Sequence, residues 1–252
     1  MSRKIIIAGN WKMNKTAAEG VEFVKELSGL VSDVKDVEIV VCPTFTALSQ
    51  VVQAAAGTNV KIGAQNIHWA ENGAYTGEIS AEMLKETGVE YVIIGHSERR
   101  QYFGESDETV NQRLVAALNA GLIPMVCIGE LLDERESGKT EDVLKTQITG
   151  AFKDISAEDM EKIVIAYEPV WAIGTGKTAT PEMAEDTHSF VRSVVAELYT
   201  PEVAEKVRIQ YGGSMKPGNS AELIGQVDID GGLVGGASLQ PDSFAELIKN
   251  AI

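Results

Sequence analysis

Short apolar segments recur along the whole chain and alternate with stretches of helical periodicity. The apolar segments are rich in β-branched residues and nearly continuous, as expected for strands that are buried on both faces. They occupy Ile5–Gly9, Val37–Cys42, Val60–Ala64, Tyr91–Ile94, Ile123–Ile128, Ile163–Tyr167, Val207–Tyr211 and Gly232–Val234. The pattern therefore predicts eight strands.

Amphipathic stretches lie between these segments. Apolar residues fall at helical spacing from Ala17 to Val31 and from Met183 to Leu198, where Thr180 can cap the helix and Pro181 suits its first turn. Another helix begins near Ser106. Weaker helical signals cover Thr46–Ala56, Ser80–Glu86, Thr140–Phe152, Ser220–Gly225 and Asp242–Lys249. Strands and helices thus alternate from one end of the chain to the other.

Eight strand–helix pairs in 252 residues predict an α/β fold, a (β/α)8 barrel with a parallel eight-stranded sheet and outer helices. The alternative is a doubly wound open sheet that binds a dinucleotide. That fold requires G-x-G-x-x-G after the first strand, where this chain has Gly9-Asn10-Trp11-Lys12. No Pro/Ser-rich linker divides the chain, so we expect residues 1–252 to form one barrel domain.

Composition and charge limit the partners. Lys and Arg number 22 against 37 Asp and Glu, and the net charge of −15 argues against nucleic acid or an anionic membrane as partner. No apolar run approaches the roughly 18 residues of a membrane span, and the apolar run after Met1 is too short for a secretory signal. Cys42 and Cys127 are too few for a disulfide framework, so we expect a reducing cytoplasm.

Polar side chains follow three of the predicted strands, at the ends where barrel enzymes place their active sites. Because strand side chains alternate, Asn10 continues one face of the first strand, and Lys12 follows if the chain stays extended. His96 continues the fourth strand in the same way. Glu168 continues the sixth, where Pro169 favours an extended backbone before it.

Each of these residues also has an ordinary explanation. Lys12 could be a solvated loop lysine, and His96 could satisfy a backbone group. Glu168 could pair with an arginine such as Arg99 or Arg208. Polar groups at three strand ends together favour one active site over three separate structural roles.

Glycine pairs follow the last two strands, in Gly212-Gly213-Ser214 and Gly235-Gly236-Ala237-Ser238. Barrel enzymes often bind phosphate with backbone N–H groups of these two loops. Ordinary tight turns would also use glycine. The location of both pairs favours phosphate binding, which needs no lysine cluster.

Two other patterns do not meet the requirements of a nucleotide-binding or metal-binding motif. Gly174-Thr175-Gly176-Lys177-Thr178 resembles a nucleotide-binding P-loop, but Trp171 stands where that motif needs its first glycine. The histidines show no spacing typical of metal ligands, so we expect no metal: they are His68, His96 and His188.

Two long loops have the properties of functional segments. Pro169 to Ala179, after the sixth strand, has the length and glycine content of a lid. Gln65 to Glu78 carries Trp69 and Tyr75 among polar residues, which favours burial against a second chain. The alternative is that this loop folds back on its own barrel.

Seven segments, in this order and at these separations, resemble the triosephosphate isomerase family from end to end. They are Ala8-Gly9-Asn10-Trp11-Lys12-Met13-Asn14, Gly77-Glu78-Ile79-Ser80, Ile94-Gly95-His96-Ser97-Glu98-Arg99-Arg100, Cys127-Ile128-Gly129-Glu130, the stretch Ala166–Thr178, Tyr211-Gly212-Gly213-Ser214, and Leu233-Val234-Gly235-Gly236-Ala237-Ser238-Leu239. The resemblance implies interconversion of dihydroxyacetone phosphate and D-glyceraldehyde 3-phosphate through an enediolate, without a cofactor.

The resemblance also implies roles for the strand-end residues. Glu168 corresponds to the base that shuttles the proton, and His96 to the electrophile at the substrate oxygens. Lys12 corresponds to the cation of the pocket and Asn10 to its neighbour. Two further residues correspond to supporting groups, Glu98 and Cys127.

Phosphate, lid and dimer contacts follow from the same resemblance. The phosphate is expected at the backbone N–H groups of Gly174, Ser214, Gly235 and Gly236. The lid includes Pro169, Trp171 and Lys177. The family is at least dimeric, so the 65–78 loop, around Thr76, is expected to reach towards the active site of a partner subunit.

The chain departs from the family pattern at two positions. Ala81 stands where many relatives have proline, which removes one backbone restraint at the start of a helix. Gly232 stands where a bulkier side chain is common, which predicts a gap or extra backbone freedom near the phosphate loop. Rival functions are another phosphate-handling barrel, such as a phosphoribosyl isomerase or an indole-glycerol-phosphate enzyme, and a catalytically idle barrel used for binding.

Overall fold

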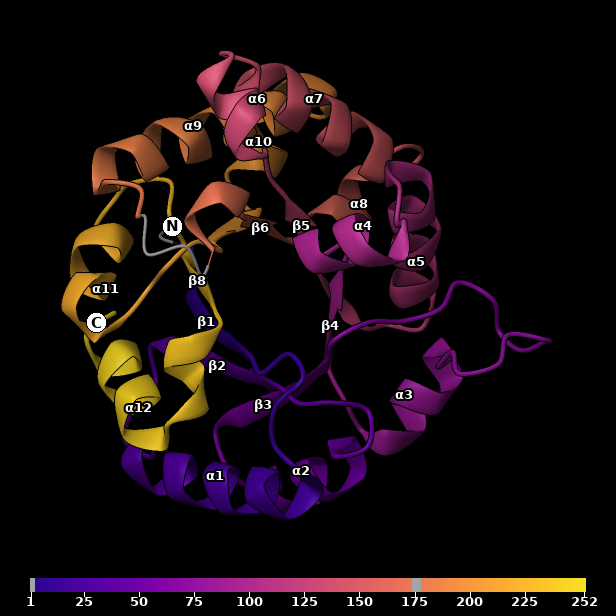
Figure 1. The fold of residues 1–252 in the computed structure, drawn as a ribbon, viewed down its shortest axis with the longest axis vertical. Helices are drawn as coiled ribbons and strands as arrows, with labels where there is room; N and C mark the ends of the chain where they lie inside the picture. The colour runs from indigo at the N-terminus through magenta and orange to yellow at the C-terminus, as the bar shows by residue number, and fades with distance from the viewer. Residues whose placement is uncertain (1–2, 174–177) are drawn as a thin grey trace.

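The computed structural model describes residues 3–173 and 178–252, and the strands among them form a closed parallel barrel in the order β1 to β8 (Figure 1). Their bounds are β1 Ile5–Asn10, β2 Val37–Cys42, β3 Val60–Ala64, β4 Tyr91–Ile94, β5 Ile123–Ile128, β6 Val164–Tyr167, β7 Arg208–Tyr211 and β8 Gly231–Val234. The barrel closes where Ile6 to Gly9 pair with Gly231 to Val234. The predicted fold class is confirmed, and each strand lies within one residue of its predicted bounds.

Helices surround the barrel as an outer ring (Figure 1). They are α1 Ala17–Leu30, α2 Leu48–Ala55, α3 Ala81–Thr87, α4 Ser97–Phe103, α5 Asp107–Asn119, α6 Leu132–Glu136, α7 Thr140–Ala151, α8 Ala157–Met160, α9 Pro181–Leu198, α10 Pro201–Ala204, α11 Pro217–Ile224 and α12 Pro241–Lys249, with 3-10 turns η1 Val170–Ala172 and η2 Gly236–Leu239. The Thr180 and Ser106 hydroxyls accept hydrogen bonds from Met183 and Thr109 at the starts of α9 and α5, as the sequence predicts. No helix among the described residues has the length and apolar character to cross a membrane.

Alternation along the strands divides the core in two. Ile6 and Ala8 of β1 belong to a cluster inside the barrel, whereas Ile7 belongs to the larger cluster between strands and helices. Both sides of each strand are therefore buried, which explains the nearly continuous apolar runs. The interior packing also leaves the carboxyl ends of the strands as the place where polar side chains can meet.

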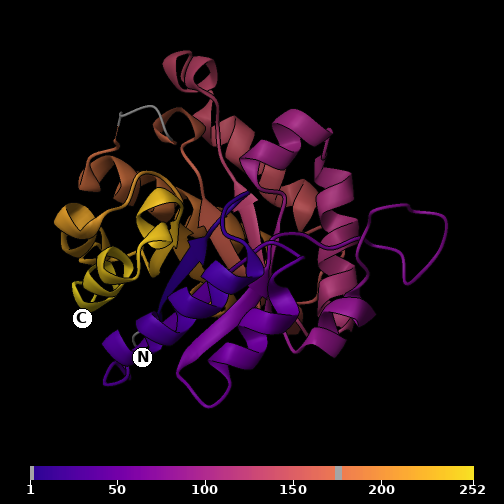
Figure 2. The same cartoon turned by 60° about the horizontal axis from the view of Figure 1, so that its bottom comes forward.

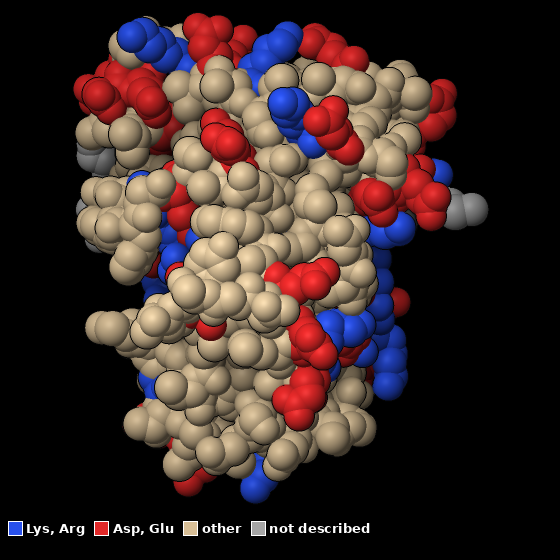
Figure 3. Space-filling view, turned by 90° about the vertical axis from the view of Figure 1, so that its right-hand side faces the viewer, with Lys and Arg blue, Asp and Glu red and all other residues tan. Residues whose placement is uncertain are grey.

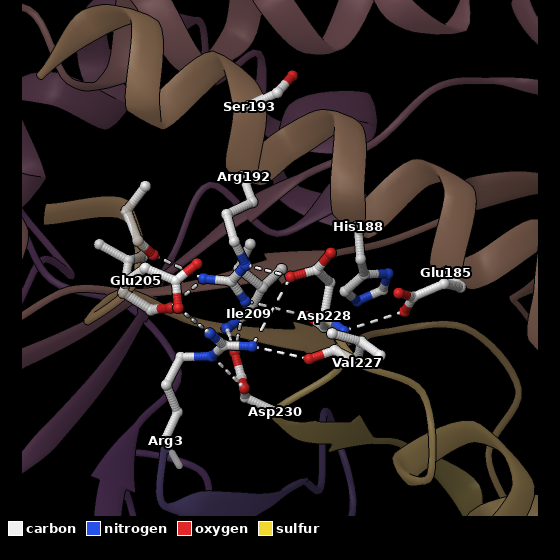
Figure 4. Close-up of polar contacts among 12 residues, drawn as sticks. Arg3, Glu185, His188, Arg192, Ser193, Glu205, Ile209, Val227, Asp228 and Asp230 are labelled. Atoms are coloured by element: carbon white, nitrogen blue, oxygen red, sulfur yellow. Dashed lines mark hydrogen bonds and ion pairs between the residues drawn. The ribbon is translucent and has the colours of Figure 1, made fainter. Parts of the chain in front are cut away.

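A largely buried network of charges joins the segment before β1 to α9 and to the segment before β8 (Figure 4). Arg192 of α9 and Arg3 converge on Asp228 and Asp230, just before β8; Arg192 Nη2 lies 2.9 Å from Asp230 Oδ2, and Arg3 Nε lies 2.6 Å from Asp230 Oδ1. Asp230 Oδ2 also accepts a hydrogen bond of 2.8 Å from the Ile209 N–H of β7. The network thus holds α9, β7 and both closing strands together.

One segment leaves the compact outline. The chain between β3 and α3 projects from the barrel wall, to the right of Figure 1 and Figure 2. At its base the His68 ring packs against the rings of Trp69 and Tyr75, with centroids 4.1 and 4.3 Å apart, and Arg113 lies over Trp69. The loop therefore packs partly on itself, while Tyr75 and Thr76 remain exposed.

Candidate active site

Four residues predicted from three strand ends line one cavity of about 410 Å³. They are Asn10, Lys12, His96 and Glu168. The same cavity is also lined by Ser214, Gly235 and Gly236, from the loops after β7 and β8. The structure therefore brings the predicted catalytic residues together with the predicted phosphate-binding residues that it describes.

Glu168 is almost fully buried at the end of β6. Its Oε1 lies 2.8 Å from His96 Nε2, and its Oε2 accepts a 2.9 Å hydrogen bond from the Ser97 N–H. It therefore does not pair with either arginine considered from the sequence: Arg99 pairs with Glu105, and Arg208 pairs with Glu38. Burial alone would raise the pKa of Glu168, but His96, the Ser97 N–H and Lys12 lower it, and the net direction is downward.

Two glycines make room for this residue. A Cβ on Gly129 would lie 1.7 Å from the Glu168 carbonyl oxygen, and a Cβ on Gly212 would lie 2.8 Å from Glu168 Cγ. Neither position can therefore take a side chain without displacing Glu168.

His96 precedes α4 and acts as its N-cap, a position that fixes its tautomer. The Glu98 N–H donates a 3.1 Å hydrogen bond to Nδ1, so the ring proton is on Nε2 and points to Glu168. Burial lowers the pKa of His96 and the Glu168 carboxylate raises it, and the net direction is upward while the two are in contact. The geometry is that of a neutral imidazole poised as a hydrogen-bond donor.

Lys12 reaches the cavity by a route that strand alternation does not predict. β1 ends at Asn10, and Lys12 has a left-handed backbone with φ +52° instead of continuing the extended strand. Its N–H donates to Asn10 Oδ1 at 3.0 Å, and its carbonyl accepts from Gln65 Nε2 at 2.9 Å. These bonds hold a conformation that costs about 1–2 kcal/mol in a residue with a Cβ. The extended-chain expectation is therefore wrong at this position, although the side chain still enters the site.

The two residues expected to support the site, Glu98 and Cys127, lie close to Lys12 and Glu168. The Lys12 ammonium group forms an ion pair with Glu98, and its Nζ donates a hydrogen bond of 2.7 Å to Glu98 Oε1. Cys127 is fully buried inside the barrel, where burial and the nearby Glu168 carboxylate hold the pKa of its thiol well above the usual value. Cys127 therefore remains a thiol at neutral pH.

The base of the predicted lid is anchored by a buried carboxylate that the sequence analysis did not single out. Glu130 Oε1 accepts hydrogen bonds from Trp171 Nε1 at 2.8 Å and from the Tyr167 hydroxyl at 3.1 Å, and Arg135 pairs with the same atom. Pro169 and Trp171 thus lie at a fixed base beside Glu168. The other predicted lid and phosphate residues of this segment, Gly174 and Lys177, lie outside the described residues.

The two departures from the family pattern are compensated by neighbouring residues. At position 81 the helix start is secured by a cap, because the Ser80 hydroxyl accepts a hydrogen bond from the Met83 N–H. The predicted gap at Gly232 is wrong. A Cβ there would lie 2.6 Å from Met215 Sδ, so Met215 fills the space that a bulkier residue would occupy.

The fold and the site are those of the (β/α)8 barrel enzymes, with a contact between Glu168 and His96 in a cavity that two glycine-rich loops also line. A family model described as triosephosphate isomerase matches residues 5–251. The triosephosphate isomerase of Fusobacterium nucleatum is 58% identical over 247 residues, covering 98% of each chain, and that of Alkaliphilus oremlandii is 56% identical, covering 98% of this chain and 99% of the relative.

The crystal structure of triosephosphate isomerase from Bartonella henselae has a TM-score of 0.89 and 40% identity, and covers 98% of each chain. The chain therefore belongs to the triosephosphate isomerase family.

Proposed function

We propose that the chain interconverts dihydroxyacetone phosphate and D-glyceraldehyde 3-phosphate in the cytoplasm, through an enediolate and without a cofactor. The supporting observation is the contact of 2.8 Å between Glu168 Oε1 and His96 Nε2 inside a cavity that Lys12 and the glycine loops also line. This set offers a base, two donors for a developing oxyanion and backbone N–H groups for a phosphate.

Glu168 is the base in this proposal. Its carboxylate is bound to His96 and to the Ser97 N–H, so substrate binding must exchange these contacts for contacts with the substrate. The carboxylate then faces a C–H next to the carbonyl, and the freed Nε2–H of His96 donates to the carbonyl oxygen. A positioned base contributes about 10²–10⁴-fold to the rate, and each preorganised donor about 3–4 kcal/mol.

The same exchange keeps His96 neutral. The upward pKa direction of His96 arises from the adjacent carboxylate, whereas burial acts in the opposite sense. When Glu168 turns towards the substrate, burial dominates and the ring donates as imidazole. Lys12 supplies the positive charge next to the enediolate, and Asn10 holds the Lys12 backbone in place.

The segment after β6 serves as a lid. An enediolate phosphate exposed to water could eliminate phosphate, so closure before proton transfer preserves the product. The proposed lid begins at Pro169, and the hydrogen bond from Trp171 to Glu130 fixes its base. The proposed phosphate contacts are Ser214, Gly235 and Gly236, together with Gly174 of the lid.

A second copy of this chain completes the assembly in the proposal. The face that contains the projecting loop has a wide area without charged residues (Figure 3). Beside Lys12 lies a hollow of about 300 Å³, lined in part by Met13 and Phe103, which are 93% and 68% exposed. The 65–78 loop of one subunit, around Thr76, would fill this hollow in the other. Exposed apolar surface of this kind is typical of an interface.

A coupled assay tests the catalytic proposal. Purified protein is supplied with glyceraldehyde 3-phosphate, and a dehydrogenase that reduces dihydroxyacetone phosphate reports the product. We expect turnover by the wild type and a large loss of kcat in Glu168→Asp, which withdraws the carboxylate by one methylene. Glu222→Asp, on the exposed side of α11, is the matched control. An inactive wild type, or an undiminished kcat in Glu168→Asp, contradicts the proposal.

Sedimentation velocity tests the assembly. We expect a dimer for the wild type, and a folded monomer with reduced activity for Thr76→Arg, which places a charge at the loop tip. A wild-type monomer at micromolar concentration would contradict the predicted interface.

A further inference from the structure

The active-site cavity has a second cation that the catalytic scheme does not use. Among the described residues, the lysines that line this cavity are Lys12 and Lys216. Lys12 is engaged by Glu98 at 2.7 Å. Within residues 3–173 and 178–252, no carboxylate lies within 4.0 Å of the Lys216 ammonium group, and the side chain is exposed at the cavity rim.

The backbone that carries Lys216 is fixed beside the proposed phosphate loops. Lys216 is the N-cap of α11, and its N–H donates a 2.8 Å hydrogen bond to Asn219 Oδ1. The amide group of Asn219 also donates to the Ser214 carbonyl at 3.1 Å. The Asn219 side chain thus fixes the backbone of Ser214 relative to that of Lys216. The side-chain amide of Asn250, at the end of α12, donates a further hydrogen bond of 3.0 Å to the Pro217 carbonyl.

The negative net charge of the chain makes a cation at the cavity important for attracting an anionic substrate. A chain with a net charge of −15 repels a phosphate dianion at long range. Backbone N–H groups act only at contact, whereas a full charge acts over the screening length of roughly 8 Å. We infer that Lys216 attracts the phosphate group of the substrate into the cavity before the contacts with Ser214, Gly235 and Gly236 form. This inference rests on the proposed function.

A charge series at position 216 tests the inference. We expect Lys216→Gln to lower kcat/KM by about three- to tenfold at low ionic strength while kcat changes less than twofold, because the cation acts on capture. Lys216→Glu should lower kcat/KM further, and Lys216→Arg should retain the wild-type kcat/KM. The differences should shrink as salt is raised. Lys153→Gln, which makes the same change in net charge between α7 and α8, is the control.

Inorganic phosphate provides a readout that does not depend on turnover. Calorimetry should show weaker phosphate binding in Lys216→Gln than in the wild type and in Lys153→Gln. The inference is overturned if Lys216→Gln matches Lys153→Gln in both measurements. It is also overturned if Lys216→Gln lowers kcat/KM and kcat equally and independently of salt, since this result would indicate a structural role. An inactive wild type that binds phosphate in the expected order would refute the proposed function and support the role of Lys216.

Discussion

Gly212 leaves the space that the side chain of Glu168 occupies, so an alanine at this position tests how closely the base must be held. The added Cβ would lie 2.8 Å from Glu168 Cγ, about 0.6 Å closer than the 3.4 Å at which ordinary contact begins. It would also lie 3.0 Å from the Tyr167 carbonyl oxygen, which the Gly212 N–H binds at 2.7 Å in the barrel wall. Because that backbone is fixed, the flexible Glu168 side chain must move.

The size of the effect follows from this displacement. A misplacement of about 1 Å can cost on the order of 100-fold in rate, so a shift of about 0.6 Å predicts a kcat about 10–100-fold lower. This range corresponds to about 1.4–2.7 kcal/mol in the activation barrier. KM should change less, because the phosphate contacts of the proposed site come from other residues.

The assay is steady-state kinetics of Gly212→Ala beside Gly218→Ala. A Cβ on Gly218 meets nothing within 4 Å and lies in the first turn of α11, so this variant should retain wild-type kinetics and be at least as stable as the wild type. Thermal unfolding shows that both variants are folded at the assay temperature. If a folded Gly212→Ala has a kcat within twofold of the wild type, the tight placement of Glu168 is not needed and the reasoning fails.

Three further predictions concern stability. Arg192→Leu should lower the free energy of unfolding by about 3–5 kcal/mol in urea denaturation, because it leaves Arg3 as the remaining cationic partner of Asp228 and the buried Asp230 and removes the donor to the buried carbonyls of Ala204 and Val207. A loss below about 1 kcal/mol would contradict this. The lowered pKa of Glu168 means that its ionised form stabilises the folded state above the ordinary value of 4.5. The difference in the free energy of unfolding between wild type and Glu168→Gln should therefore be largest at pH 7 and shrink as the pH falls through the pKa of Glu168 in the folded state. Denaturant titrations at several pH values measure it, and a difference that does not change with pH would contradict the pairing with His96. Gly232→Ala should destabilise the wild type but not a Met215→Ala background, where the clash at 2.6 Å is absent; equal costs in calorimetry would show that Met215 does not fill this space.

The sequence predicts those features that depend on local periodicity. The strands are buried on both faces, so their apolar runs mark them within one residue of their observed bounds. His96 and Glu168 also follow from local information, because a parallel barrel brings the carboxyl ends of all its strands to one face. Alternation along β4 and β6 then directs both side chains to the same cavity.

Contacts between residues that only the closed barrel brings together cannot be predicted from local periodicity. The left-handed backbone of Lys12 depends on Gln65, which lies 53 positions later in the chain. Glu130 gains its role as lid anchor only when Trp171 and Tyr167 are brought to it. Neither glutamine nor glutamate has a local signature for such a role, so no periodic pattern could identify them.

The charged groups at the three strand ends are paired with one another or with Glu98, and substrate binding has to change these pairs. Lys12 is bound to Glu98 at 2.7 Å, and the almost fully buried Glu168 is bound to His96 at 2.8 Å. A buried charge without a partner is costly, so these pairs stabilise the charged side chains of the cavity. Substrate must replace the contact between Glu168 and His96, and the free energy for that exchange has to come from parts of the substrate that do not react. The phosphate group is the part able to supply it. A triose without phosphate should therefore lose kcat as well as affinity, because the base would remain bound to His96.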